Sequence, residues 1–311
     1  MGIPIDKIAS AAKMGASAHN EADTPVRVGV YVDESATKFL IDTVREAFVP
    51  QTTSALVRVE RLGEETVTVK PDTDIVIVIS CGGAHLQAAV QQIVVAGAPT
   101  VVLAESSVEV PFIPQDTRML GLVAATDKVH LLESLARWIL DRTEKGVAFA
   151  ANFPFMRVAA ANRAITSTAL TNMATGALIF IPGADFPVMT LAQLGMMLQL
   201  ATIYGKPIRA ERGYEVAGVL GAGLVLRGCA RLACRRAGYA GFAVKALVGG
   251  VGTFALGRAL TALYERDVDY SAANELLGKI AGRLRTVMAG AAGFAAGDDA
   301  AVGADTMRAE A

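Results

Sequence analysis

The sequence has few of the residues from which disulfide frameworks and metal sites are built. Its 311 residues include three cysteines, three histidines and one tryptophan. Three cysteines give no disulfide framework and are typical of a protein from a reducing compartment. The cysteines and histidines also lack the spacing of metal ligands. We therefore expect no metal.

The sequence also lacks an excess of either charge, because 29 basic and 30 acidic residues leave a net charge of −1. Nucleic-acid-binding proteins normally show a basic imbalance, so we expect no nucleic-acid partner. Residues 1–22 contain no long apolar run followed by a cleavage site, so they do not fit a secretory signal and are predicted to be a flexible arm. The Ala/Gly/Asp-rich residues 290–311 are predicted to be a disordered tail.

The phosphate-binding motifs of nucleotide enzymes are absent as well. A GTPase carries GxxxxGK[ST] after its first strand, but Glu34 and Ser35 stand where glycine and lysine would lie. Lys38 follows three residues too late, and no GxGxxG is present. We therefore expect no cofactor, no catalytic residues and no enzymatic activity.

Residues 23–145 alternate between strand and helix patterns. This alternation predicts an α/β domain with a parallel sheet, either Rossmann-like or a degenerate P-loop-like form. Residues 75–79 are continuously β-branched, as expected of a central strand covered on both faces. The predicted strands are 26–32, 56–61, 66–69, 75–80, 100–104 and 119–124. The predicted helices are 35–48, 84–96 and 128–142, with Asp127 as the cap of the last one.

Residues 157–264 lack an alternating strand pattern, and residues 150–289 are predicted to form an all-α domain. Two uncharged runs, 164–184 and 186–205, are each about 30 Å long as helices, which suits a membrane span or a large helical core. Only Asp185 separates them, so we expect a hydrophobic helical hairpin. Gly249, Thr253 and Gly257 recur at the spacing of helix contacts. The predicted helices are 154–181, 185–204, 209–237, 241–266 and 271–288.

The predicted turn of this hairpin accounts for the one charged residue between the two runs, Asp185. Pro182 and Gly183 end the first helix, Asp185 caps the second, and Pro187 is tolerated in the first helical turn. Basic residues flank the hairpin and none lies in the turn, which places both ends on the cytoplasmic side. Polar residues such as Gln193 weaken both runs as spans. We therefore expect peripheral or shallow insertion at the cytoplasmic face of the inner (cell) membrane, with a cytoplasmic protein as the alternative.

The turn Ser80-Cys81-Gly82-Gly83 is the candidate ligand site. It follows the most apolar strand and precedes a predicted helix, whose free N–H groups and dipole favour an anion such as a phosphorylated small molecule. Two glycines are also what a tight turn requires, so both interpretations stay open. A helix start could lower the pKa of Cys81, with His85 as its base, although a small buried cysteine is the simpler interpretation.

Basic residues also recur on one predicted helix. Arg227, Arg231 and Arg235 are four residues apart and share a face, joined by Arg236. This stripe, with Lys245 further along, fits either a solvated surface or contact with anionic lipid headgroups or a partner protein.

Several segments resemble one bacterial family. These are Ile181-Pro-Gly-Ala-Asp-Phe-Pro187, continuing to Gln193, and Ala240-Gly-Phe-Ala-Val-Lys245. Across residues 157–265 the chain resembles the domain-of-unknown-function 697 family, whose members often follow a Ras-like GTPase domain and are in part predicted membrane proteins. The chain departs from the family pattern at Ala192, where Asn is usual, and at Leu226, where an aromatic residue is usual. The resemblance implies no catalytic residues.

Together these features predict a non-enzymatic, membrane-associated scaffold, sensor or oligomerisation protein with a degenerate nucleotide-binding-like domain. One alternative is a cytosolic α/β domain that binds a phosphorylated small molecule at Ser80–Gly83. The other is a pseudo-GTPase that pairs with a true GTPase. Self-association is a further expected interaction.

Overall fold

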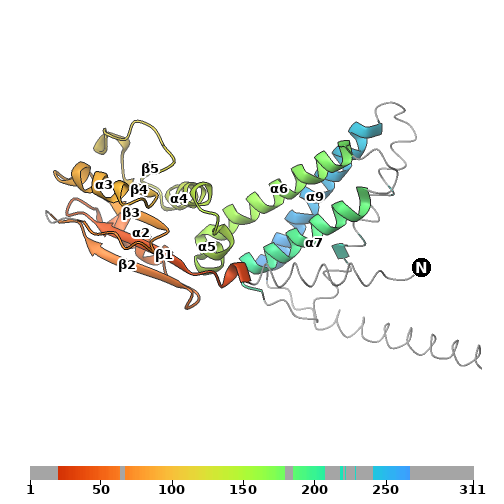
Figure 1. Cartoon of the computed structure of the whole chain (residues 1–311), viewed down its shortest axis with the longest axis horizontal. Helices are drawn as coiled ribbons and strands as arrows, with labels where there is room; N and C mark the ends of the chain where they lie inside the picture. The colour runs from red at the N-terminus through yellow and green to blue at the C-terminus, as the bar shows by residue number, and fades with distance from the viewer. Residues whose placement is uncertain are drawn as a thin grey trace, which may run out of the picture. The chain divides into compact units, whose positions relative to one another are not determined.

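Five parallel strands form the sheet of the first half of the chain in the computed structural model (Figure 1). The structure describes residues 20–63, 67–178, 185–206 and 241–266, together with Gly218, Val219, Gly221 and Gly228. The strands lie in the order β2-β1-β3-β4-β5, one of the two common orders of doubly wound sheets. They are β1 (Val26–Val32), β2 (Ala55–Arg61), β3 (Ile75–Ile79), β4 (Thr100–Ala104) and β5 (Leu120–Ala124).

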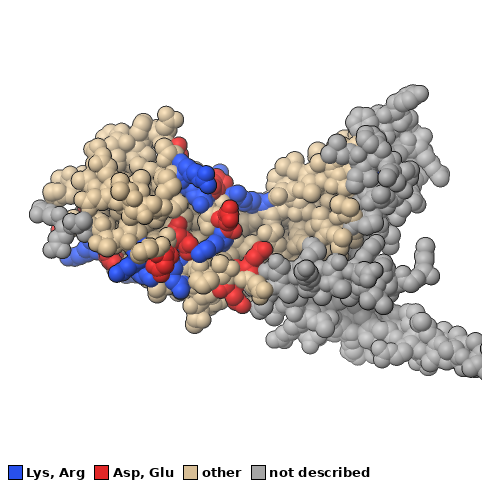
Figure 2. Space-filling model, viewed as in Figure 1, with Lys and Arg blue, Asp and Glu red and all other residues tan. Residues whose placement is uncertain are grey.

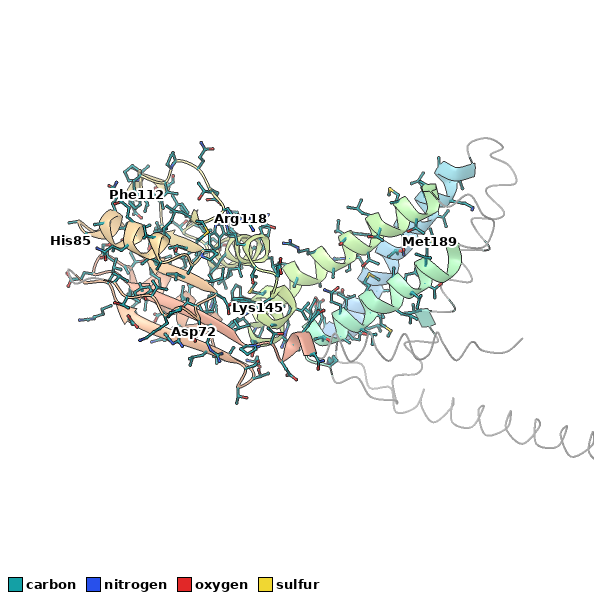
Figure 3. All side chains as sticks on the ribbon, in the orientation of Figure 1. Asp72, His85, Phe112, Arg118, Lys145 and Met189 are labelled. Carbon is teal, nitrogen blue, oxygen red and sulfur yellow. The ribbon has the colours of Figure 1, made fainter. Side chains whose placement is uncertain are left out.

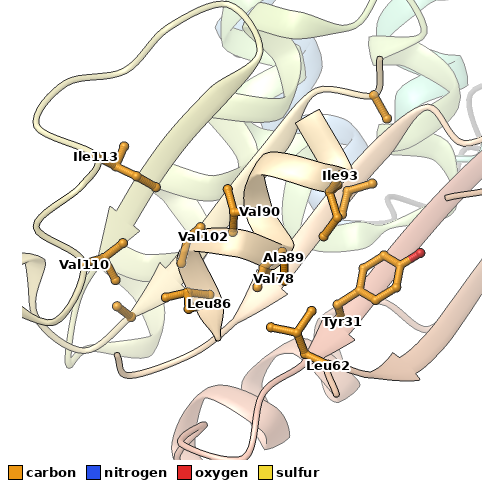
Figure 4. Close-up of a cluster of buried hydrophobic side chains, with 13 residues drawn as sticks. Tyr31, Leu62, Val78, Leu86, Ala89, Val90, Ile93, Val102, Val110 and Ile113 are labelled. Carbon is orange, nitrogen blue, oxygen red and sulfur yellow. The ribbon is translucent and has the colours of Figure 1, made fainter. Parts of the chain in front are cut away.

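Helices cover both faces of the sheet. On one face α3 (Leu86–Val95) packs its buried side chains against Val78 of β3 and Val102 of β4 (Figure 4). On the other face α4 (Lys128–Arg142) places Trp138 directly over Gly121 of β5. Every residue of β3 and β4 is buried as a result, which explains their continuous apolar sequences.

Most of the predicted elements in this half are confirmed, apart from the ends of some helices and strands. The helix α2 (Lys38–Ala47) begins after Thr37, whose hydroxyl accepts the N–H of Leu40, and α4 has the predicted cap at Asp127. The strand predicted at 66–69 is wrong, because residues 67–69 make no strand. The Val67 N–H donates instead to Gln92 Oε1 at 3.1 Å, and this segment packs partly buried beside α3.

A short segment after α4 joins the sheet region to the later helices. It comprises α5 (Gly146–Asn152), which the sequence did not predict, and a 3₁₀ turn η2 (Pro154–Met156). The rings of Phe153 and Phe155 lie 5.0 and 5.1 Å from that of Phe48, which follows α2. Asn152 is fully buried, and its Oδ1 accepts the Thr52 hydroxyl at 2.6 Å. This segment is therefore part of the core beside the sheet.

Three long helices follow: α6 (Arg157–Leu178), α7 (Asp185–Ile203) and α9 (Gly241–Glu265). All three contact one another, and α6 and α9 approach most closely (Figure 1). Glycines make this approach possible. A Cβ on Gly257 would lie 2.6 Å from Ile165 Cγ1, and one on Gly250 would lie 2.9 Å from Met173 Cε.

Several predictions fall outside the described residues. These are the hairpin turn with Pro182 and Gly183, the helices 209–237 and 271–288, residues 1–19 of the arm and the tail 290–311. The backbone of α7 begins at Asp185, but the side chains of Asp185 and Pro187 are not described. The hairpin and its cap therefore stay predictions.

The contact at Gly257 leads to a first prediction. Gly257→Ala should destabilise the packing of α6 on α9 by about 1–3 kcal/mol, because the added methyl group overlaps the Ile165 side chain. Thermal unfolding of the full chain measures the loss. Ile165→Ala removes the overlapping atoms, so the double variant should lose less than the sum of the two single losses. Strict additivity would contradict the contact.

Candidate functional site

The carboxyl ends of β1 and β3 lie side by side where the winding of the sheet reverses. From β1 the chain passes to β2 on one side, and it then crosses to β3 on the other side of β1. Doubly wound sheets bind their ligands outside the carboxyl ends of strands at such a switch point. The turn after β1 carries Asp33 and Ser35, and the turn after β3 carries Ser80–Gly83. The predicted candidate turn therefore lies at the position where this topology places ligands.

A buried carboxylate joins the two turns. Asp33 is only 9% exposed, and its Oδ2 accepts hydrogen bonds from the hydroxyls of Ser80, at 2.8 Å, and of Ser35. The two hydroxyl oxygens are 3.1 Å apart, and the Asp33 N–H donates to Ile79 O at 2.9 Å. A buried charge requires such donors, so this network fixes the position of both turns.

The same hydroxyls accept hydrogen bonds from the backbone N–H groups that were expected to bind an anion. The Cys81 N–H donates to Ser35 Oγ at 2.9 Å, and the N–H groups of Gly82 and Gly83 lie 3.3 and 3.4 Å from Ser80 Oγ. Behind both hydroxyls lies the Asp33 carboxylate. An incoming anion would have to displace these hydroxyls and approach a negative charge. Ligand binding at Ser80, Cys81, Gly82 and Gly83 stays a prediction, and this arrangement opposes an anion.

Both glycines have structural roles in the turn. Gly82 has a φ of +93°, and a Cβ on it would lie 2.9 Å from Glu109 O. A Cβ on Gly83 would overlap the Asp33 carboxylate. These contacts favour the interpretation that the turn itself requires glycine.

The idea that a helix start activates Cys81 is wrong. Helix α3 begins at Leu86, with His85 as its N-cap (Figure 3), so Cys81 lies ahead of the helix and does not open it. Burial raises the pKa of the Cys81 thiol, and the nearby Glu109 carboxylate raises it further. The N–H groups of Glu105 and Thr37 oppose this shift only in part. A raised pKa keeps the thiol protonated, whereas the thiolate is the reactive form of a cysteine.

Gln193 belongs to a buried polar layer that the sequence did not reveal. The amides of Asn172 in α6 and Gln193 in α7 both donate to Thr253 Oγ1 in α9, at 2.8 and 3.0 Å. The Thr253 hydroxyl in turn donates to Gly249 O at 2.7 Å. We call Asn172, Gln193 and Thr253 the polar layer. Its three residues are at most 2% exposed, so Gln193 connects helices inside the core.

The remaining predicted contacts are placed only in part. Lys245 lies near the start of α9 and is half-buried, and its carbonyl faces Gly176 of α6. Arg227, Arg231, Arg235 and Arg236 lie outside the described residues. Among the residues that are described, no cluster of three or more His, Cys, Asp or Glu side chains is arranged to hold a metal ion.

Asp33 and Ser35 were missed as site residues. One signal was available, since Asp33 directly follows the predicted strand 26–32 and Ser80 ends the predicted strand 75–80. Recognising their contact requires knowing that β1 and β3 are neighbours, and the local sequence pattern does not give the order of strands.

The Asp33 network predicts a coupled effect of two substitutions. Gly83→Ala should destabilise the chain by about 1–3 kcal/mol, because its methyl group overlaps the Asp33 carboxylate. In an Asp33→Ser background the same substitution should have a much smaller effect. Chemical denaturation of the four variants measures the coupling. An equal loss in both backgrounds would show that Asp33 is not the obstacle.

The raised pKa of the Cys81 thiol predicts slow alkylation. The test uses a Cys229→Ser, Cys234→Ser background at about pH 8.5, the ordinary pKa of a cysteine. There iodoacetamide should modify the Cys81 thiol more slowly than it modifies the thiol of free glutathione. A raised pKa keeps the thiol protonated there, so the rate should still rise with pH above that value. Mass spectrometry follows the modification. A rate that levels off below pH 8.5 would contradict the assignment.

Comparisons with known proteins found no relative of this chain. No family model matches the chain, and neither the curated proteins nor the solved structures contain a significant match to it. The resemblance to the domain-of-unknown-function 697 family therefore stays a prediction from the residues quoted for it.

Proposed function

We propose that this protein is a non-enzymatic, membrane-associated scaffold, sensor or oligomerisation protein whose later helices contact the cytoplasmic face of the inner membrane. The observation that carries the proposal is an exposed apolar surface on α9. Leu247, Val251 and Phe254 are 57%, 59% and 47% exposed. Their spacing of four and three residues places them on one side of the helix. We call these three residues the apolar stripe.

Helix α6 extends this surface. Leu170 and Met173 are exposed on α6, and Met173 lies against Gly250 of α9, next to the apolar stripe. Exposed apolar surfaces of this kind mark contacts with membranes or with other proteins. In the view of Figure 2 the described helices show almost no charged atoms, whereas the sheet region shows both signs.

The length of α9 fits contact with lipid. Residues Ala243–Glu265 are long and apolar enough to cross a membrane. Only 28% of their most apolar stretch is buried, whereas a core helix of a soluble protein is mostly buried. Lys245 and Arg258 both interrupt the helix, however, so a full crossing would require both charges to reach the interface. Shallow insertion with the stripe facing the acyl chains agrees best with both features.

The polar layer supports helix association in such an environment. Buried amide and hydroxyl groups hydrogen-bond across helices where the surroundings are apolar. The Asn172 amide also lies 3.4 Å from Met189 O of α7, and α6 and α7 pack together. These contacts support the proposed hairpin of α6 and α7. The α/β domain, degenerate in its nucleotide motifs, would then act as the interaction module.

Flotation with phosphatidylglycerol-containing vesicles tests the membrane proposal. The wild-type chain should float with the vesicles, and Val251→Glu should reduce the bound fraction at least about tenfold, because it places a charge in the apolar stripe. Ala259→Glu is the matched control, since this exposed residue on α9 lies off the stripe. A wild-type chain that stays soluble and monodisperse, both with vesicles and in fractionated cells, would refute the proposal.

A second candidate function is binding of a phosphorylated small molecule at Ser80–Gly83. The position of this turn at the switch point between β1 and β3 favours it. Melting of the full chain with a panel of nucleotides and sugar phosphates tests it, with Gly82→Val as the blocked variant. An increase in Tm that disappears in the variant would support binding, and no increase across the panel would exclude these ligands. Pairing with a true GTPase, self-association and headgroup contact by the Arg227–Arg236 stripe are further proposals.

A further inference from the structure

Strand β2 is the outermost strand on one side of the sheet, and no described strand pairs with its outer edge (Figure 1). It pairs in parallel with β1 over its full length of seven residues. Its sequence contains neither proline nor lysine, the residues with which proteins commonly protect such an edge. Val59 is 66% exposed and Leu56 is 44% exposed. The edge is therefore open to another strand.

The backbone groups of alternate β2 residues face this open edge. In a parallel pair, every second residue of a strand directs both its N–H and its C=O to the same neighbour. The Leu62 N–H donates to Val32 O of β1 at 2.9 Å, so the even-numbered residues of β2 bond to β1. Val57, Val59 and Arg61 therefore direct their N–H and C=O groups outward. These groups have no hydrogen-bond partner in the described part of the chain.

A second copy of β2 can use these outward groups in an antiparallel pair. Hydrogen bonds across a two-fold axis require an outward-facing residue to lie opposite itself. If Val59 lies opposite the partner's Val59, then Val57 lies opposite the partner's Arg61, and all these residues face outward. Arg58 then lies opposite the partner's Glu60, and Glu60 lies opposite the partner's Arg58. Side chains at such positions are close enough to interact.

The charges select this register over its neighbours. An axis at Arg61 would place two arginines opposite each other. An axis at Val57 would place Arg58 opposite the partner's Leu56, which offers no charge. The axis at Val59 pairs opposite charges twice, because the two-fold symmetry repeats the contact.

The Arg58 side chain is already positioned for such a contact. Its guanidinium donates two hydrogen bonds to the Asp72 carboxylate, both at 2.8 Å. Arg27 also lies 3.7 Å from this carboxylate, so two arginines share one negative charge. Positive charge therefore remains at Arg58 for a further carboxylate. Glu60 is exposed and can supply that carboxylate to the other copy.

We propose that a second copy of this chain binds along β2, so that the two sheets join into one across a two-fold axis at Val59. Backbone hydrogen bonds and burial of the two Val59 side chains provide the affinity, and the Arg58–Glu60 pairs fix the register. The inference rests on the proposed oligomerisation role and assigns that role to the sheet edge. It requires neither the apolar stripe nor the switch point.

Val59→Pro tests the backbone part of this interface. Proline removes the outward N–H of residue 59, and it is tolerated on an edge strand where that N–H has no partner in the monomer. Two-fold symmetry removes two hydrogen bonds at once, so the Kd of the dimer should rise at least about tenfold. Val59→Thr keeps the N–H and a β-branched side chain, so it should dimerise much as the wild type does. Sedimentation equilibrium of the full chain measures each Kd, and thermal unfolding confirms that the variants are folded.

Exchange of charges tests the register. Glu60→Arg places arginines opposite each other in both pairs, and Arg58→Glu places carboxylates there, so each variant alone should dimerise more weakly. A mixture of the two variants restores opposite charges, and the Kd of the mixed dimer should be about tenfold lower than that of either variant alone. Should Arg58→Glu unfold, Glu60→Arg is compared with Glu60→Gln. Glu60→Gln removes the charge without reversing it and should weaken the dimer less.

The outcomes separate this interface from the proposed function. A dimer whose Kd is unchanged in folded Val59→Pro and Glu60→Arg would overturn the β2 interface and leave the oligomerisation role in place. A wild-type chain that stays monomeric at high micromolar concentration would overturn both. Val251→Glu, the vesicle-binding variant, should leave the Kd unchanged. A Kd that rises in Val251→Glu and not in Val59→Pro would assign the association to the helices and overturn the β2 interface.

Discussion

The Asp33 carboxylate sets the conditions under which the carboxyl edge of the sheet can act. A buried charge requires hydrogen-bond donors, and the hydroxyls of Ser35 and Ser80 supply them from two different turns. The same hydroxyls accept backbone N–H groups of the turn after β3. The chain's own charge therefore lies where doubly wound sheets usually admit a ligand.

Helix α9 combines two surfaces with different requirements. Gly257, Gly250 and Thr253 allow close contact and hydrogen bonding with α6 and α7, whereas Leu247, Val251 and Phe254 are exposed. Close packing of helices requires small residues at the contact, whereas the exposed positions carry large apolar side chains. Both sets are uncharged, so the sequence shows one long apolar segment. Only the packing reveals that some of its residues face α6 and α7 while others are exposed.

The sequence predicted what depends on local pattern and missed what depends on distant contacts. The β-branched run of β3 and the cap at Asp127 were recognised because each is a local feature. The sequence of residues 66–69 resembles a strand, but the backbone N–H of Val67 donates a hydrogen bond to the Gln92 side chain. The candidate turn was found through its glycines, whereas its partner Asp33 required the order of the strands. The polar layer joins residues from three helices, and no spacing in the sequence links them.

The segment around α5 also determines where the chain can be divided. A fragment ending at Lys145 would contain the five strands of the described sheet, yet Phe48 would lose the rings of Phe153 and Phe155. Thr52 would lose its hydrogen bonds to the Asn152 side chain as well. The α/β region thus obtains part of its interior from residues that follow the change in composition. Independent expression of this region therefore requires the chain to continue at least through Met156.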